Sequence, residues 1–294
     1  MNDLSGRVIL ITGAGNGLGR EHALLLAARG AKVGVNDLSA EAAGAVVDEI
    51  TARGGEAMAL AASVTDMDDV QAMVSRLAET WGRIDGLVNN AGILRDKSFA
   101  KMEISDFRLV IEVHVMGAVN CCKAVWPLMQ AQQFGRIVLT TSSSGLYGNF
   151  GQSNYGAAKM ALVGLMRTLA IEGARYDIRV NSIAPTAATQ MLDGLLPEEE
   201  LNLLDPARVS PGIVALMRED APNNMVLCAG AGAFASANIT LTAGAKIAEG
   251  EGAVEDLLAR WQTVTDRDRE SLPQSGADQG RQELLHAGHT RTAM

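Results

Sequence analysis

Residues 7 to 30 combine a short apolar run, a glycine-rich turn and a helical pattern, and this order strongly constrains the fold. The run 7–12 is rich in β-branched residues, which is typical of a buried strand. Glycine recurs at 13, 15, 17 and 19 in a Thr-Gly-x-x-x-Gly-x-Gly spacing, and the helical pattern 20–29 stops at Gly30, a common C-cap. Backbone N–H groups in such a turn can approach a pyrophosphate at the positive end of the helix. The unit therefore predicts a dinucleotide-binding site.

Asp37 stands at the end of the next apolar run, eighteen residues past Gly19. A carboxylate at that place can accept hydrogen bonds from the adenosine ribose hydroxyls and would repel a 2′-phosphate. Arg20 and Lys32 could favour a phosphate, but neither follows this run. The sequence therefore predicts NAD as the cofactor. A helix-capping role for Asp37 is the alternative.

Apolar runs and helical patterns alternate through most of the chain. This alternation predicts an α/β fold with a Rossmann-type doubly wound parallel sheet of about seven strands and helices on both faces. The predicted strands are 7–12, 31–36, 56–62, 84–89, 135–141, 178–184 and 224–229, and the later helices are 40–53, 67–81, 101–131, 154–175 and 207–218. In such a sheet the ligand binds at the carboxyl ends of the strands, where Gly13, Asp37, Asn90, Ser142 and Pro185 are all expected.

Tyr155 and Lys159 are four residues apart in a predicted helix, and they follow a cluster of hydroxyl side chains at 140–144. The spacing places both side chains on one helix face. A nearby ammonium would lower the pKa of the phenol from its usual value of about 10, toward the range in which a general acid or base is effective. A Tyr-x-x-x-Lys pair alone is weak evidence, so its meaning depends on the rest of the chain.

The glycine motif, the Ser-Tyr-Lys set, Asn89-Asn-Ala-Gly92 and Ile183-Ala-Pro185 occur in an order that resembles the short-chain dehydrogenase/reductase family. The resemblance covers residues 5 to about 230. Within that family the chain is most similar to the (3R)-hydroxyacyl-CoA dehydrogenase domain of the peroxisomal multifunctional enzymes of β-oxidation. The segments that carry this closer resemblance are 35–38, 89–99, 148–152, 170–173 and 197–199.

This resemblance implies roles for individual residues. Ser142 would hold the substrate oxygen, Tyr155 would carry the proton, and Lys159 would assist Tyr155 and bind the nicotinamide ribose. The residues expected to bind the cofactor are Gly13, Asn16, Gly17, Leu18, Gly19, Asp37, Ser63, Val64, Asn90, Ala91, Gly92, Tyr155, Lys159, Pro185, Ala187 and Thr189. The residues expected to contact the substrate are Ser142, Ser144, Asn149, Gln152 and Met191.

Two positions depart from the common family pattern. The family usually has an asparagine in the middle of the helix before the catalytic strand, where it holds a water that reaches the lysine, and here that position is His114. His114 either serves the same relay or is a structural histidine packed between helices. Thr186 follows Pro185 where a Pro-Gly pair is usual, which affects the loop on the nicotinamide side.

The function implied by the resemblance is hydride transfer between NAD and a secondary alcohol, most directly a (3R)-3-hydroxyacyl-CoA with a fatty or polycyclic acyl chain. Apolar residues in 191–196 suit such a substrate, although a lid helix packed on the domain would have the same pattern. The alternatives are a hydroxysteroid or other secondary-alcohol dehydrogenase, or a 3-oxoacyl thioester reductase. A catalytically silent nucleotide-binding or scaffold subunit is disfavoured by the complete set of catalytic residues.

The chain has 294 residues and a net charge of −9, which argues against nucleic acid or an anionic membrane as the main partner. We find no apolar run of eighteen residues and no leader pattern, and we expect a cytoplasmic protein. Three cysteines form no metal-ligand pattern, so buried free thiols and no metal are expected. Apolar stripes on the predicted helices 101–131 and 154–175 favour a homodimer or homotetramer, with burial inside one chain as the alternative. Residues 1–271 are expected to form one domain, and 272–294 a polar tail that is loosely ordered or binds a partner.

Overall fold

The computed structural model describes residues 4–187 and 198–289. Internal contacts divide the chain into a first unit, Met1–Ser236, and a second unit, Ala237–Met294. The sequence instead places a boundary after residue 271. The difference arises because the composition becomes polar only near residue 272, whereas the internal contacts divide the chain after Ser236.

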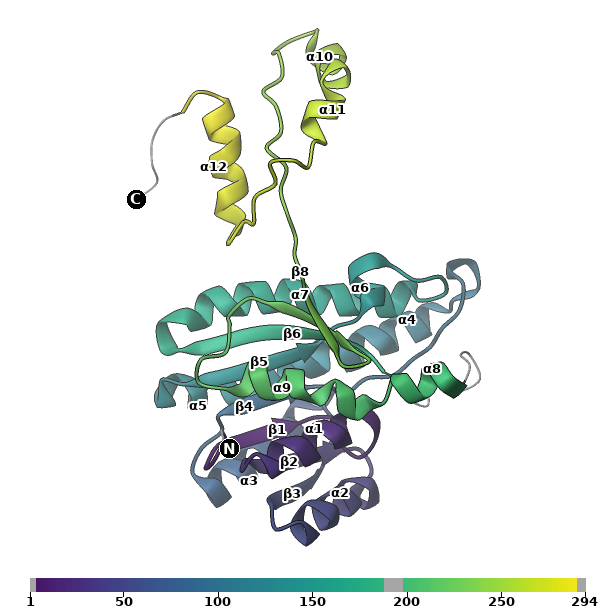
Figure 1. Ribbon diagram of the computed structural model, residues 1–294, viewed down its shortest axis with the longest axis vertical. Coiled ribbons are helices and arrows are strands. Elements are labelled where there is room, and N and C mark those ends of the chain that lie inside the picture. Colours follow the sequence, from purple (N-terminus) through teal and green to yellow (C-terminus); the bar gives the residue numbers. More distant parts are fainter. Residues whose placement is uncertain (1–3, 188–197, 290–294) are drawn as a thin grey trace. The chain divides into compact units, whose positions relative to one another are not determined.

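The first unit is built on a sheet of eight strands in the order β3-β2-β1-β4-β5-β6-β7-β8 (Figure 1). The pairs from β3 through β7 are parallel, and β1 lies between β2 and β4, so the chain order reverses there. The strands are β1 (Val8–Ile11), β2 (Lys32–Asp37), β3 (Glu56–Ala61), β4 (Gly86–Asn89), β5 (Gly135–Thr140), β6 (Ile178–Thr186), β7 (Val226–Gly230) and β8 (Ala233–Ala237). The predicted parallel α/β fold is confirmed, and the predicted seven strands are all present.

The eighth strand, β8, was not predicted. Its residues are mostly exposed, and its sequence Ala-Phe-Ala-Ser-Ala contains no β-branched residue. A strand with that composition gives no periodic signal. It forms because the chain turns back at the sheet edge beside β7.

Helices connect successive strands and form two layers (Figure 1). One layer contains α1 (Gly17–Ala28), α2 (Ala40–Ala52) and α9 (Ser210–Met217); the other contains α3 (Met67–Trp81), α4 (Ile104–Ile111), α5 (Gly117–Gln132) and α7 (Ser153–Gly173). Shorter elements are η1 (Phe99–Lys101), η2 (Glu112–Met116), α6 (Ser143–Tyr147), η3 (Ala174–Tyr176), α8 (Glu198–Leu203) and η5 (Pro206–Arg208). The predicted helices and strands agree with these bounds within three residues at each end.

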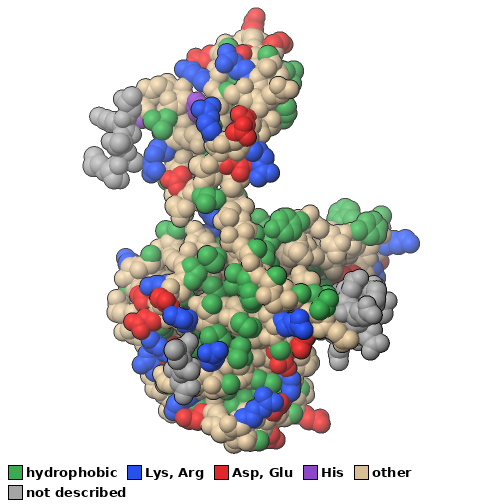
Figure 2. Space-filling view, in the orientation of Figure 1, with side chains coloured by type: hydrophobic (Ala, Val, Ile, Leu, Met, Phe, Trp, Pro, Cys, Tyr) green, Lys and Arg blue, Asp and Glu red, His purple; other side chains and the backbone are tan. Residues whose placement is uncertain are grey.

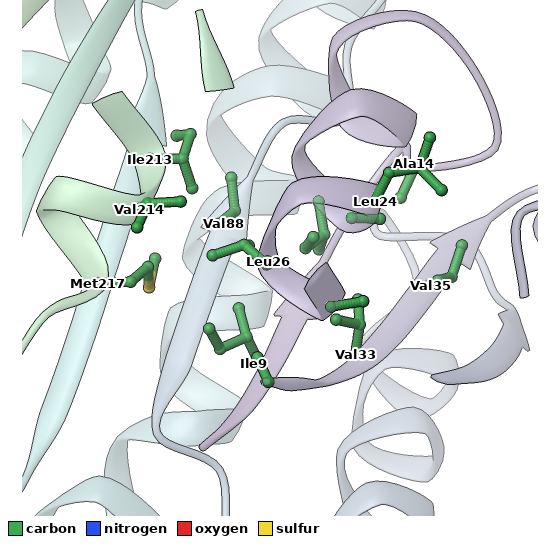
Figure 3. Packing of buried hydrophobic residues seen from close by; sticks show 14 of the residues in the cluster. Ile9, Ala14, Leu24, Leu26, Val33, Val35, Val88, Ile213, Val214 and Met217 are labelled. Atoms are coloured by element: carbon green, nitrogen blue, oxygen red, sulfur yellow. The ribbon is translucent and has the colours of Figure 1, made fainter. Parts of the chain in front are cut away.

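The core of the α1 layer explains why the first strands are so apolar. β1 and β4 are buried at every position, so both faces of these strands need aliphatic side chains. Figure 3 shows Leu26 of α1 and Met217 of α9 among the side chains that pack beside Ile9, Val33 and Val88 of the sheet. This packing joins the first βαβ unit to a helix almost 200 residues later in the chain.

The predicted helix 101–131 is observed as three segments, because a π-helical turn, η2, separates α4 from α5. The helical stretch Ile104–Gln132 is long enough to cross a membrane and contains an eighteen-residue window that is apolar enough by composition alone, although the sequence contains no uninterrupted apolar run of that length. In the fold it links β4 to β5, and its residues Val110, Cys121, Val125 and Met129 are buried. Its apolar character therefore follows from its place beside the sheet.

The second unit contains α10 (Ala253–Ala259), α11 (Trp261–Val264) and α12 (Gly276–His286). A capping box at Ser275 and Asp278 starts α12, and Gln282 of α12 donates to the carbonyls of Thr242 and Ala243. The expected loosely ordered tail is thus helical over eleven residues. Its helix has a weak apolar pattern, which is why sequence periodicity did not reveal it.

Candidate functional site

The glycine-rich turn after β1 has no room for a side chain at Gly13 or Gly15. Gly13 and Gly17 adopt left-handed φ values of 60° and 52°. A Cβ on Gly13 would lie 2.8 Å from Ala91 Cα, and one on Gly15 would lie 2.7 Å from an Asp37 carboxylate oxygen. Asn16 is the N-cap of α1 but makes no side-chain capping hydrogen bond, so the first N–H groups of the helix keep their capacity to bind an anion.

Asp37 lies beside this turn, as predicted. Its carboxylate accepts hydrogen bonds from Gly15 N at 3.0 Å and Ser39 N at 3.1 Å. Ser39 caps α2, because its side chain accepts from Ala42 N, so helix capping does not explain Asp37. A carboxylate has about four lone-pair positions, which leaves capacity for further donors such as ribose hydroxyls.

Asn90 joins the ends of β1 and β4. Its side-chain amide donates to Thr12 O at 3.1 Å and Gly13 O at 2.9 Å, and its own N–H donates to Thr12 Oγ1 at 3.0 Å. Ala91 N also donates to Thr12 Oγ1. Thr12 is therefore a site residue that the sequence reasoning did not assign, although it opens the recognised glycine motif.

Other predicted cofactor residues also follow strands at this edge. Ser63 hydrogen-bonds Thr65 after β3, and Val64 O accepts from Asn120 Nδ2 at 3.0 Å. Leu18 and Gly19 lie in the first turn of α1, Gly92 follows Ala91, and Pro185 and Ala187 lie at or after the end of β6. Thr189, also expected to bind cofactor, lies outside the described residues.

Ser142 follows β5 and caps α6, a short helix that the sequence did not predict. Its hydroxyl accepts from Ser144 N at 3.1 Å, so the strand does not continue through the serine cluster. Ser143 is exposed, whereas Ser142 and Ser144 are buried. The structure therefore favours Ser142 as the group beside Tyr155, where its hydroxyl acts to lower the pKa of the phenol.

Tyr155 and Lys159 lie on one face of α7, as predicted from their spacing. Lys159 Nζ is 5.3 Å from the centre of the Tyr155 ring and donates to Thr140 O at 2.6 Å. The lysine side chain is almost fully buried, and Gly145 provides its space, because a Cβ there would lie 2.8 Å from Lys159 Cβ. The backbone of Lys159 is held by Thr141, whose hydroxyl donates to Lys159 O.

The electrostatics of this pair differ from the sequence expectation. Burial raises the pKa of Tyr155 above its usual value of 10.0, the hydrogen bond from Ser142 opposes that rise, and the charge of Asp96 adds to it. Burial also lowers the pKa of Lys159 from 10.5 to about 7. The expected lowering of the Tyr155 pKa by Lys159 is wrong for this arrangement, because loss of hydration dominates at both groups.

His114 lies in the π-helical turn η2 and reaches the same site. Its ring meets the Tyr155 ring edge-on at 5.3 Å, and its Nε2 lies 3.0 Å from Ile93 N and 2.9 Å from Ile93 O. Burial and the nearby Lys159 charge lower the pKa of His114 to about 3, so the ring is neutral. Gly92 is required here because a side chain would strike the imidazole. His114 Nδ1 is buried and has no hydrogen-bond partner among the described residues.

A small cavity connects His114 with Lys159. Its volume is about 10 Å³, and Thr12, Asn89, Val113 and Leu162 also line it. That volume is close to the minimum of about 10–15 Å³ that one buried water needs. The unpartnered Nδ1 and the lysine ammonium thus border a space of one-water size.

The predicted substrate residues Ser144, Asn149 and Gln152 lie together. Gln152 Oε1 accepts from Ser144 Oγ at 2.7 Å and Asn149 Nδ2 at 3.1 Å, and Gln152 Nε2 donates to Asp96 Oδ2 at 2.6 Å. Met191, also predicted to contact substrate, lies outside the described residues.

Two further residues of this network were not assigned from the sequence. Asp96 lies within the recognised segment 89–99, but nothing in that segment shows where its side chain points. Asn154 is fully buried beside Tyr155; its Oδ1 accepts from Tyr155 N at 2.7 Å, and its amide donates to Arg95 O at 3.0 Å. In the sequence, only the position of Asn154 directly before Tyr155 could have indicated that it belongs to the site.

Comparisons with known proteins agree with this geometry. The chain is 43% identical over 276 residues to a short-chain type dehydrogenase/reductase of Mycobacterium tuberculosis, covering 90% of this chain and 96% of that protein. It is 50% identical over 228 residues to the peroxisomal multifunctional enzyme type 2 of Drosophila melanogaster, covering 74% of this chain and 38% of that enzyme. The chain therefore spans well under half the length of that enzyme.

Solved structures show the same relationship. The full-length Drosophila enzyme superposes with a TM-score of 0.82 at 40% identity, covering 96% of this chain and 49% of that one. A 7α-hydroxysteroid dehydrogenase complexed with NADH and 7-oxo glycochenodeoxycholic acid has a TM-score of 0.73 at 32% identity, covering 78% and 94%. The family described as short chain dehydrogenase matches residues 7–200, which include the glycine turn, Ser142, Tyr155 and Lys159. The chain therefore belongs to the short-chain dehydrogenase/reductase family of oxidoreductases.

Proposed function

We propose that this protein is an NAD-dependent dehydrogenase that oxidises the 3-hydroxyl group of (3R)-3-hydroxyacyl-CoA thioesters. The observation that carries the proposal is that three groups converge: Lys159 Nζ lies 5.3 Å from the centre of the Tyr155 ring on α7, and Ser142, directly after β5, acts to lower the pKa of that phenol. The similarity to peroxisomal multifunctional enzymes supports the choice of a hydroxyacyl thioester over other secondary alcohols.

The residues present fit a nicotinamide dinucleotide. A side chain at Gly13, Gly15 or Gly19 would clash with its neighbours, α1 offers uncapped N–H groups for the pyrophosphate, and Asp37 can accept from the adenosine ribose. Asn90, Ala91 and Lys159 would lie along the nicotinamide half. When bound, the dinucleotide supplies the hydride acceptor, and the carboxylate of Asp37 favours NAD over NADP.

The protein side of the reaction is a proton transfer. Ser142 positions the substrate hydroxyl beside Tyr155, and Tyr155 removes its proton as the carbon loses hydride. Because burial disfavours phenolate, Tyr155 needs a nearby positive charge when it acts as a base. Lys159, with a pKa of about 7, is balanced between its two protonation states near neutral pH and can take part in passing the proton on.

His114 completes this path in our proposal. A single water in the cavity between His114 and Lys159 would satisfy the buried Nδ1 and link the lysine to it. His114→Asn should keep turnover within about threefold, because an amide can hold the same water, whereas His114→Phe should lower turnover by about tenfold or more. Equal rates for the two variants would assign His114 a packing role only.

The function is tested by measuring NADH or NADPH formed from NAD or NADP with (3R)- and (3S)-3-hydroxybutyryl-CoA, a hydroxysteroid and a simple secondary alcohol. We expect turnover with the (3R) thioester and NAD. Turnover of a hydroxysteroid or a simple secondary alcohol without any thioester activity would replace the substrate proposal but keep the dehydrogenase. No NADH from the whole panel would indicate a catalytically silent nucleotide-binding protein.

We also propose that the protein is a homodimer or homotetramer. Leu109 and Met116 on α4 and η2, and Met160 and Ile171 on α7, are between 38% and 54% exposed. Large apolar side chains on neighbouring helix surfaces are typical of an interface between copies. Sedimentation at micromolar concentration should show a species larger than 30.9 kDa; a single species of that mass would contradict the proposal.

A further inference from the structure

Two segments form a wall on the substrate side of Tyr155. The segment 93–98, which follows β4, is tied to the loop 148–154 before and at the start of α7. Lys97 N donates to Gly151 O at 2.9 Å, Asn154 Nδ2 donates to Arg95 O at 3.0 Å, and Gln152 Nε2 donates to Asp96 Oδ2 at 2.6 Å. Figure 1 shows the loop before α4 running beside α6, and Figure 2 shows apolar side chains at this end of the first unit.

Asp96 determines the orientation of the Gln152 amide. With Nε2 on Asp96, the carbonyl oxygen of Gln152 faces Ser144 and Asn149 and accepts from both. The reversed amide would place its oxygen against the Asp96 carboxylate, which is repulsive. Ser144 therefore donates its only hydroxyl proton to Gln152, and toward a substrate it can act only as an acceptor.

The charge of Asp96 is not neutralised by its neighbours. The adjacent cations turn away, because Lys97 Nζ lies 3.2 Å and Arg95 Nε lies 4.0 Å from carboxylate oxygens of Asp106. Within residues 4–187 and 198–289, Asp96 forms no ion pair. Its charge helps to raise the pKa of Tyr155, and its hydrogen bond to Gln152 connects it to Ser144 beside Ser142.

We infer that Asp96 is a specificity-determining residue that makes this site select secondary alcohols with an uncharged acyl group, such as a thioester or ester, over free hydroxy acids. This inference rests on the proposed function. The carboxylate of a free 3-hydroxy acid lies two carbons from the reacting carbon, so it would meet the negative charge of Asp96 and the acceptor oxygen of Ser144. A thioester carries no charge there and avoids the repulsion.

The test uses ethyl (R)-3-hydroxybutyrate and the (R)-3-hydroxybutyrate anion, which share the reacting carbon and differ in charge. The kcat/KM ratio of ester to acid is measured with NAD for the full chain, Asp96→Asn and Asp48→Asn, which neutralises an exposed carboxylate on α2. Asparagine can still accept from Gln152, so Asp96→Asn removes charge while keeping the hydrogen bond. We expect the ratio to fall by about tenfold in Asp96→Asn, as Coulomb repulsion near a surface allows, and to stay unchanged in Asp48→Asn.

Asp96→Ala separates the orienting effect from the charge. Because it also frees the Gln152 amide to reverse, KM for the ester should rise severalfold relative to Asp96→Asn; equal KM values would overturn the orienting role. An unchanged ratio in Asp96→Asn, or an equal fall in Asp48→Asn, would overturn the charge selection. If the unmodified protein oxidises neither of these compounds nor a hydroxyacyl-CoA, the proposed function fails, and this inference fails with it.

Discussion

Buried charged side chains lie at both edges of the sheet, the amino edge where the strands begin and the carboxyl edge where they end. The charges at the two edges differ in how many of their hydrogen-bond positions are filled. At the amino edge, where β1, β4 and β5 begin, Arg136 is fully buried and each of its three nitrogen atoms donates a hydrogen bond. Its acceptors include Asp177 and the carbonyls of Arg218 and Glu219. Asp85 at the same edge accepts from Arg7, Arg83 and Val8 N.

At the carboxyl edge, where the same strands end, buried polar groups are left with spare capacity. The ammonium of Lys159 has one hydrogen-bond acceptor among the described residues, Thr140 O. Thr140 Oγ1 and His114 Nδ1 are buried without a partner in that part of the chain. Spare donors and acceptors cost stability, and they are what a bound substrate, water or cofactor would use.

The number of hydrogen-bond partners of each buried charge therefore distinguishes a structural network, at the amino edge, from a site of chemistry, at the carboxyl edge. When a buried charge has all its hydrogen-bond partners, replacing one residue of the network lowers the free energy of unfolding strongly. A buried charge with one partner destabilises the chain but can change protonation near neutral pH. The four predictions that follow test this distinction.

The largest effect is expected at the carboxyl edge. Tyr155→Phe removes only the hydroxyl, so folding and NAD binding should survive while turnover falls by about 10²- to 10⁴-fold, as for loss of a positioned acid or base. Steady-state NADH formation measures this. Tyr147→Phe is the matched control, because Tyr147 is 73% exposed and should keep its rate. A near-normal rate in Tyr155→Phe, with loss in Tyr147→Phe, would reassign the proton carrier.

At the amino edge, Arg136→Met should lower the free energy of unfolding by about 3–5 kcal/mol, because it leaves the backbone carbonyls of Gly135, Asp177, Arg218 and Glu219 without their donor, whereas the Asp177 carboxylate keeps Arg179. Urea unfolding measures the loss, and turnover per folded molecule should be unchanged. Arg83→Met at the same edge should lower the free energy of unfolding by less than about 1 kcal/mol, since Arg83 is 42% exposed and Asp85 keeps its ion pair with Arg7. Similar losses in both variants would show that burial does not distinguish them.

Lys159→Met should have the opposite sign and raise the free energy of unfolding at pH 7 by about 2 kcal/mol, while abolishing turnover. The shifted pKa corresponds to a cost of about 4 kcal/mol at pH 7, and loss of the hydrogen bond to Thr140 O offsets part of this gain. The pKa of Lys159 is lowered from 10.5 to about 7, so folding releases its proton. The resulting cost is complete below pH 7 and disappears as the pH rises toward 10.5.

The advantage of Lys159→Met in unfolding free energy should therefore shrink by about 2 kcal/mol between pH 7 and pH 9. Urea unfolding of both proteins at the two pH values measures this change. A constant difference, or a variant less stable than the unmodified protein at pH 7, would refute the cost assigned to the buried ammonium.

The smallest effect concerns Asp37. We expect kcat/KM to favour NAD over NADP by at least about tenfold, or 1.4 kcal/mol, because a 2′-phosphate would meet the carboxylate. Asp37→Ser should reduce this preference. Asp66→Asn changes a different carboxylate, the N-cap of α3 at the carboxyl edge, and should leave the preference for NAD unchanged. Efficiency with NADP equal to that with NAD in the unmodified protein would remove the role assigned to Asp37.

Much of the first unit was predictable from local patterns. The seven predicted strands and their connecting helices were found within three residues, because β-branched runs and helical periodicity are properties of neighbouring residues. The π-helical turn at 112–116 and the strand β8 were not predictable in this way. One changes hydrogen-bond register inside a continuous helical pattern, and the other forms by pairing at a sheet edge.

The candidate site divides in the same manner. Spacing alone predicted that Tyr155 and Lys159 share a helix face, and the alternation of elements predicted that Asp37, Asn90 and Ser142 follow strands at one edge. The roles of Thr12 and Asp96 emerged only from contacts with residues 78 and 56 positions away. Sequence spacing cannot reveal such pairs, because the fold decides which turns meet.

The sequence by itself determined the parallel α/β fold, the glycine turn and the set of residues that can carry a proton, because periodicity and residue chemistry depend only on residues close together in the chain. Only the tertiary structure decided the protonation tendencies of these groups. Spacing suggested that Lys159 lowers the pKa of Tyr155, yet burial raises the Tyr155 pKa and lowers that of Lys159. Hydration is lost through packing by the whole fold, so its effect cannot be read from two residues four positions apart.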